Sequence, residues 1–113
     1  MTRDARDHLD DVLEAIAKRE RFTEGMTDET FIEDEKTVDA VLRNFEVIGE
    51  AAKNVPEDVR HANPAVPWSE MAGMRDKLIH GYATVELRIV WTTVQEELPS
   101  LAPQIEDVRD RLE

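Results

Sequence analysis

Apolar residues recur along the chain at intervals of three and four, the spacing that places side chains on one face of a helix. The pattern predicts an amphipathic helix over residues 4–21, and Phe22 can extend its apolar face. A second long helix is predicted over residues 35–54, ending before Pro56. The inward-facing positions are Leu9, Val12, Leu13, Ile16 and Ala17 in the first helix, and Val38, Val41, Leu42, Phe45, Ile48, Gly49 and Ala52 in the second.

The connection between these two helices carries residues that often end and begin helices. Gly25 favours a helix stop, because glycine adopts a left-handed backbone at little cost. Thr27 or Asp28 can cap a new helix, and a short helical turn is predicted from Glu29 to Asp34. Small residues between positions 49 and 52 of the second long helix permit another helix to approach closely.

The stretch after Pro56 predicts shorter elements separated by prolines. One helical turn is predicted over residues 57–62, followed by an extended segment over residues 63–67. A helix then opens near Trp68 and continues to His80, with Gly81 as its terminating residue.

The last third of the chain predicts two more helical stretches. Thr84 caps a helix that runs to about Leu98. Pro99 and Pro103 fit the start of a final helix to Leu112, either separate or as a kinked continuation of the helix before it. The elements together predict an all-α bundle of four to five helices.

Composition places this bundle among globular proteins. The 113 residues are 41% hydrophobic and 35% charged, which predicts one domain over residues 1–113 with a real core and solvated outer faces. No apolar run approaches a membrane span, and the charged N-terminus lacks the apolar segment of a signal peptide. The absence of cysteine excludes disulfides and thiolate metal sites. We therefore expect a soluble, cytoplasmic protein that does not associate with membranes.

The net charge of −12 limits how the chain can bind nucleic acid. A polyanion is usually met by a basic face, whereas the overall field of this protein repels it. An RNA site would therefore be a local basic pocket, for which Arg75, Lys77 and Arg88 are candidates, with Lys53 as a further one. The acidic excess, with ten Arg against four Lys, also fits a chain that stays soluble in high salt.

The most informative segment is residues 73–82, Gly-Met-Arg-Asp-Lys-Leu-Ile-His-Gly-Tyr, at the end of a predicted helix. Arg75 can hold two phosphate oxygens with its planar fork. His80 can donate or accept a proton near neutral pH, and Tyr82 presents a phenol. RNA supplies its own nucleophile, the 2′-OH, so such a set can cleave RNA without a metal, leaving a 2′,3′-cyclic phosphate and a 5′-OH. The alternative is a helix end whose Arg, Asp76 and His only satisfy carbonyls and solvent.

The spacing of the motif raises a geometric question. Arg75 and His80 are five residues apart, which places them roughly 140° apart around a straight helix. Unwinding at Gly81, the long reach of Arg, or a second copy of the motif across a two-fold axis can bring them to one phosphate. The two-fold axis is the most economical of these.

Several blocks of sequence agree with a known family in order and spacing. They are the helix from Asp39 to Pro56, Pro67-Trp68, the segment from Ala72 to Tyr82, and Val90-Trp91 to Leu98-Pro99. Over nearly the whole chain, this pattern closely resembles the HepT-like branch of the HEPN superfamily, the toxin half of HepT/MntA toxin–antitoxin pairs.

The resemblance implies a HEPN-type bundle that forms a symmetric homodimer, with the active cleft at the interface. It implies that Arg75 and His80 are ribonuclease residues, assisted by Asp76, and that no metal or other cofactor is needed. It also implies that a partner nucleotidyltransferase of the MNT type attaches AMP to Tyr82. A bulky anion there would block RNA and occupy the basic groups. The alternative from a different class is a non-catalytic module that only complexes with the nucleotidyltransferase.

Other candidate residues favour structural roles. His8 and His61 are isolated and lack metal-ligand spacing, so we interpret them as surface or capping residues. The acidic run at 33–35 is interpreted as a solvated helix start, and the acidic end at 106–113 as a solvated face. The set of Met26, Met71, Met74 and Trp91 is interpreted as core or dimer interface.

Overall fold

The computed structural model describes the backbone of residues 4–81 and 87–112, and the side chains of residues 4–74 and 87–112. Within these ranges the chain is helical and contains no strand. The helices are α1 (Ala5–Thr23), α2 (Asp28–Glu33), α3 (Glu35–Asn54), α4 (Glu57–Ala62), α5 (Trp68–Gly81), α6 (Leu87–Thr92), the π-helical η2 (Thr93–Glu97) and α7 (Leu98–Arg111).

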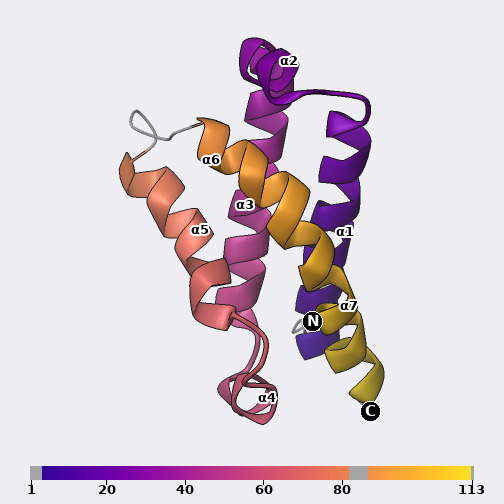
Figure 1. Cartoon of the computed structure of the whole chain (residues 1–113). Helices are drawn as coiled ribbons and strands as arrows, with labels where there is room; N and C mark the ends of the chain where they lie inside the picture. The colour runs from indigo at the N-terminus through magenta and orange to yellow at the C-terminus, as the bar shows by residue number, and fades with distance from the viewer. Residues whose placement is uncertain (1–3, 82–86, 113) are drawn as a thin grey trace.

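Four long helical rods form the bundle, and α3 lies at its centre. Figure 1 shows α3 between α1 and α5, and both of these helices pack along it. The fourth rod consists of α6, η2 and α7, and it crosses from α2 at one end of the molecule to α1 at the other. The structure therefore confirms the predicted all-α bundle.

The structure shows how the first two helices begin and end. Asp4 caps α1, where its carboxylate accepts from the Asp7 backbone N–H at 3.1 Å. Gly25 has φ of +76°, the left-handed conformation expected at a helix stop. Of the two candidate caps for α2, Thr27 is the one used, and its hydroxyl accepts from the Thr30 backbone N–H at 3.2 Å.

The last rod does not break at its prolines, so of the two predicted possibilities the continuation is the one observed. Pro99 has no N–H to donate to the preceding turn. Immediately before it, η2 adds one residue to the turn, and the Leu98 N–H reaches back to the Thr93 carbonyl. Pro103 lies inside α7. The rod thus absorbs both prolines without an intervening loop.

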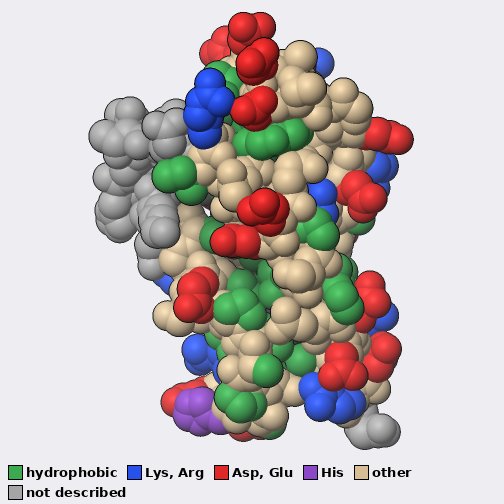
Figure 2. Space-filling model, viewed as in Figure 1, with side chains coloured by type: hydrophobic (Ala, Val, Ile, Leu, Met, Phe, Trp, Pro, Cys, Tyr) green, Lys and Arg blue, Asp and Glu red, His purple; other side chains and the backbone are tan. Residues whose placement is uncertain are grey.

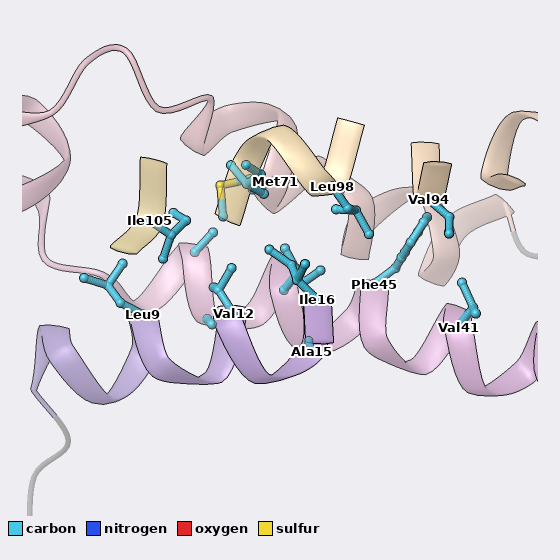
Figure 3. Packing of buried hydrophobic residues seen from close by; sticks show 14 of the residues in the cluster. Leu9, Val12, Ala15, Ile16, Val41, Phe45, Met71, Val94, Leu98 and Ile105 are labelled. Atoms are coloured by element: carbon cyan, nitrogen blue, oxygen red, sulfur yellow. The ribbon is translucent and has the colours of Figure 1, made fainter. Parts of the chain in front are cut away.

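The core is a single cluster of buried apolar side chains to which every long helix contributes (Figure 3). The predicted inward face of α3 is confirmed, since each of its seven positions is buried. On α1 the prediction was wrong at two positions: Ala17 and Phe22 are exposed, whereas Ala15 is buried and faces the core. Ala15 and Ala17 are both small, so their hydrophobicity alone does not indicate which of the two faces the core.

Three polar side chains are buried although the apolar pattern did not predict it. Arg19 and Thr23 on α1 and Asn44 on α3 are each 5% exposed. Among the described residues, neither the Arg19 Nε nor the Asn44 Nδ2 has a hydrogen-bond partner. Burial lowers the pKa of the Arg19 guanidinium, and the charge of Glu20 opposes this shift.

Candidate functional site

The motif lies on α5, and the N-terminal end of this helix is firmly anchored. Trp68 is 8% exposed, and its indole N–H donates to the Asn63 carbonyl at 3.0 Å. The Met71 backbone N–H donates to the Pro67 carbonyl at 3.0 Å, and the Met71 side chain is fully buried. The helix therefore leaves the proline-rich connection in a fixed direction.

The small residues of α3 that permit a close helix approach face both neighbouring helices. Ala52 lines a groove with Trp68 and Ala72 of α5, whereas Ala51 lines one with His8 and Asp11 of α1. Gly49, Ala51 and Ala52 are all buried. Gly73 on α5 has a different role, because no described atom lies within 4 Å of the point that a Cβ would occupy there. The glycine that opens the motif is therefore not required by a close contact among the described residues.

The last two turns of α5 carry Arg75, Asp76, Lys77 and His80. The helix continues through Gly81, so the unwinding at this residue that the sequence left open is not observed. Positions 75 and 80 are consequently separated by a rise of about 7.5 Å and a rotation of about 140°. The side chains of these four residues lie outside the described part of the structure, as do Tyr82 and the predicted cap Thr84.

Helix α6, which follows the motif in sequence, is held by α2. Arg88 forms an ion pair with Asp28 at 2.9 Å, joining residues 60 positions apart. Beside it, the rings of Phe31 and Trp91 contact each other with their centroids 5.2 Å apart. Arg88, one of the candidate RNA-binding residues, therefore has an acidic partner at the α2 end of the bundle.

Lys53, the other candidate outside the motif, lies at the opposite end. It is exposed on the last turn of α3 and lines an open groove of about 830 Å³ between α3, α4 and the start of α5. Arg60 and His61 of α4 line the same groove. The structure thus does not bring Lys53 and Arg88 together. It does place Lys53 in one groove with Arg60, which the sequence did not single out, and with His61, which was interpreted as a surface or capping residue.

The walls of this groove are fixed by local contacts. The Arg60 Nε donates to the Val55 carbonyl at 3.0 Å, and the His61 Nε2 lies 3.6 Å from a carboxylate oxygen of Glu57. Glu70 adds a carboxylate to the lining. Figure 2 shows basic and histidine side chains beside acidic ones at the α4 end, whereas acidic side chains gather over α2 at the other end.

The remaining candidates take structural positions. Within residues 4–74 and 87–112, no three acidic or histidine side chains group as a metal site, and Asp34 instead caps α3 by accepting from the Thr37 N–H at 3.1 Å. His61 is exposed, and His8 is half-buried. Met26, Met74 and Trp91 pack partly buried against the core. In the described part of the chain, no helix is both long enough and apolar enough to span a membrane.

Comparison with known proteins identifies the family. The model of the ribonuclease HepT-like family matches residues 12–108, which include all of α5. The chain belongs to this family. The expected resemblance is thereby confirmed at the level of family and fold.

Curated relatives match over most of their length. "Probable ribonuclease HepT" of Thermococcus cleftensis is 49% identical over 109 residues, covering 96% of this chain and 99% of the relative. A "Putative RNase" of Methanocaldococcus jannaschii is 44% identical, covering 94% and 88%, and one of Caldanaerobacter subterraneus is 40% identical, covering 91% and 92%. No solved structure matches the chain significantly.

Proposed function

We propose that this protein is a metal-independent endoribonuclease, the toxin of a HepT/MntA-type toxin–antitoxin pair. The observation that carries the proposal is a family match that runs through the whole of α5, together with relatives named as ribonucleases. The motif Arg-x4-His-x-Tyr is intact at residues 75–82 of this chain.

The residues of the motif divide the work of phosphodiester cleavage. Arg75 binds the scissile phosphate and stabilises the charge that develops on its equatorial oxygens. His80 removes the proton from the 2′-OH and returns one to the leaving 5′ oxygen. Asp76 orients these basic groups, and Lys77 adds positive charge for RNA. The 2′ oxygen forms a bond to phosphorus as the 5′ oxygen leaves, so the products are a 2′,3′-cyclic phosphate and a 5′-OH.

A symmetric dimer supplies the geometry that one helix lacks. Positions 75 and 80 are about 7.5 Å apart along α5 and point about 140° apart. If two copies pair across a two-fold axis near the end of α5, the Arg75 of one protomer can meet the His80 of its partner. Each cleft then contains residues of both chains, and the isolated protomer is inactive.

Tyr82 is the proposed point of control. It lies two residues after His80 in the sequence, so a group attached to its phenol would stand beside the cleft. An MNT-type nucleotidyltransferase that transfers AMP to this oxygen would introduce an anion. This anion competes with RNA for the cationic groups and blocks the site sterically.

The net charge of −12 favours one alternative, a non-catalytic module that only binds the nucleotidyltransferase. Such a protein would have no need to attract RNA. Gene context would not separate the two functions, because a neighbouring nucleotidyltransferase is expected for both. Activity separates them.

The deciding experiment is RNA cleavage by the purified chain in excess EDTA. Wild type is expected to cleave and to leave cyclic-phosphate ends, whereas Arg75→Ala and His80→Ala are expected to be inactive while remaining folded. His8→Ala is the matched control, because it removes a histidine from α1 and should keep full activity. Equal inertness of wild type and variants, with Tyr82 unmodified by intact mass, would establish the binding module in its place. Loss of wild-type activity in EDTA would refute the metal-free mechanism.

Mixing the two inactive variants tests the shared cleft. If each cleft takes Arg75 from one protomer and His80 from the other, a mixed dimer keeps one complete cleft. Random mixing should then restore roughly a quarter of wild-type activity, since half of the dimers are mixed and each has one of two sites. No recovery after subunit exchange would show that both residues act from one chain.

A further inference from the structure

The groove between α3, α4 and the start of α5 gathers cationic side chains in a strongly acidic protein. Among the described residues, Lys53 and Arg60 add positive charges to its lining, Glu70 adds a carboxylate, and the His61 Nε2 lies 3.6 Å from a carboxylate oxygen of Glu57. The whole chain carries −12. The groove is therefore a place where the local field can favour an anion although the overall field does not.

The groove also leads toward the motif along one helix. Trp68 and Ala72 of α5 line it. Positions 75 and 76 follow three and four residues later, within about 60° of position 72 around the axis and about 4.5 to 6 Å further along it. Position 80 follows about 12 Å along the same axis. A strand lying in the groove would continue directly to the turns of α5 that carry Arg75 and His80.

We propose that this groove is an RNA-binding subsite, which holds phosphates of a single-stranded segment on one side of the scissile phosphate. This proposal rests on the proposed ribonuclease function. Lys53 and Arg60 bind the phosphates, and His61 and the polar rim contact the sugar–phosphate chain. A single strand is the expected form, because an 830 Å³ groove admits a few nucleotides rather than a duplex.

The shape of the groove fits a backbone-binding role better than base readout. Its apolar wall consists of the Pro64–Pro67 segment, and the large ring of Trp68 is 8% exposed. A ring so covered offers no open face on which a base can stack. The groove should therefore bind RNA with little sequence preference and with a marked dependence on salt.

Binding is tested with the full-length protein and a labelled single-stranded RNA in which every 2′-OH is methylated. This probe cannot be cleaved by 2′-OH attack, so its affinity is measured whether or not the protein is a nuclease. Lys53→Gln should weaken binding about fivefold near 0.1 M salt, and should reduce the slope of log K against log salt by about 0.7. Glu70→Gln should strengthen binding, because it removes a carboxylate from the lining.

Lys36→Glu is the matched control for Lys53→Glu. Both residues are exposed on α3, at its first and last turns, and both substitutions lower the net charge by the same two units. Lys53→Glu should weaken binding far more than Lys36→Glu. Equal weakening would mean that only net charge matters, and it would overturn the proposal, as would a wild-type protein that does not bind the probe.

Cleavage provides a second, independent readout. Lys53→Gln should lower kcat/KM on a long RNA several-fold more than on a dinucleotide, since a dinucleotide contains only the scissile phosphate. An equal loss on both substrates would show that Lys53 acts on the fold or at the scissile phosphate, and the subsite would be refuted. If wild type cleaves nothing, the proposed function fails, while the binding comparison still decides whether the groove holds RNA.

Discussion

Phe31 offers the sharpest test of how α2 supports the helix that follows the motif. The predicted role of α2 was only a short helical turn, yet Phe31 is fully buried and its ring meets Trp91 of α6. Replacing a buried phenylalanine by alanine removes the burial of the ring and leaves a cavity, which together cost about 3–5 kcal/mol. Phe31→Ala should therefore lower the free energy of unfolding by about 4 kcal/mol.

The size of this loss is large compared with the stability of an ordinary domain, which is about 5–15 kcal/mol. With an m-value of about 2 kcal/mol/M, the urea midpoint should fall by about 2 M. Unfolding is followed by circular dichroism and tryptophan fluorescence at one protein concentration, since a dimer would make stability depend on concentration. Ile89→Ala is the control on α6: Ile89 is 66% exposed, and its loss should change stability by less than about 0.5 kcal/mol.

The ring contact itself is separated from burial by a double-mutant cycle with Phe31→Leu and Trp91→Leu. The pair should show a coupling of about 0.5–1.5 kcal/mol. A loss below about 1 kcal/mol for Phe31→Ala would refute the reasoning, because it would mean that α2 does not dock on α6 in solution.

Two further predictions compare residues that differ in a single physical property. Gly73→Ala should raise the free energy of unfolding by about 0.5–1 kcal/mol, because Gly73 is helical with open space for a Cβ among the described residues. Gly25→Ala should lower the free energy of unfolding by about 1 kcal/mol: a Cβ there also has open space, but the backbone is at φ +76°, which costs alanine energy. If both substitutions changed stability in the same direction in urea melts, the backbone argument would be contradicted. Arg19→Met should raise stability by about 1 kcal/mol, since it removes a buried donor that has no partner among the described residues. Exposed Arg21→Met is the control in the same melts, and a loss of stability in Arg19→Met would show that the guanidinium makes a favourable bond.

The sequence predicted the helices well because their signals are local. The 3.6-residue period located α1 and α3, and Gly25 and Thr27 marked the connection between them. The continuous rod from α6 to α7 was left open, because a π-helical turn before Pro99 depends on packing rather than on the residue types nearby. The buried Arg19 was not foreseen for a related reason: charge predicts exposure, and only the neighbouring helices decide otherwise.

The candidate site divides in the same way. The motif could be placed on the last turns of a helix from sequence alone, and α5 confirms that placement for the backbone. The roles of Arg75, Asp76, His80 and Tyr82 stay predictions. The ion pair of Arg88 with Asp28 could not be predicted, because it joins segments 60 residues apart. The groove of Lys53 with Arg60 and His61 was missed because α4 carries no signal of where it folds back.

The acidic charge and an RNA substrate are compatible if the charges act locally. The 20 residues of α3 span about 30 Å, with the acidic α2 at one end and Lys53 at the other. The Debye length is about 8 Å at physiological salt, so the carboxylates over α2 are largely screened from the groove. What a phosphate encounters there is the balance of Lys53, Arg60 and Glu70, together with the pair of His61 and Glu57. Higher salt shortens the Debye length further, so the groove can then prefer phosphates only through direct contacts. The direction of α5, which leads from the groove to Arg75, determines where a bound strand would meet the motif.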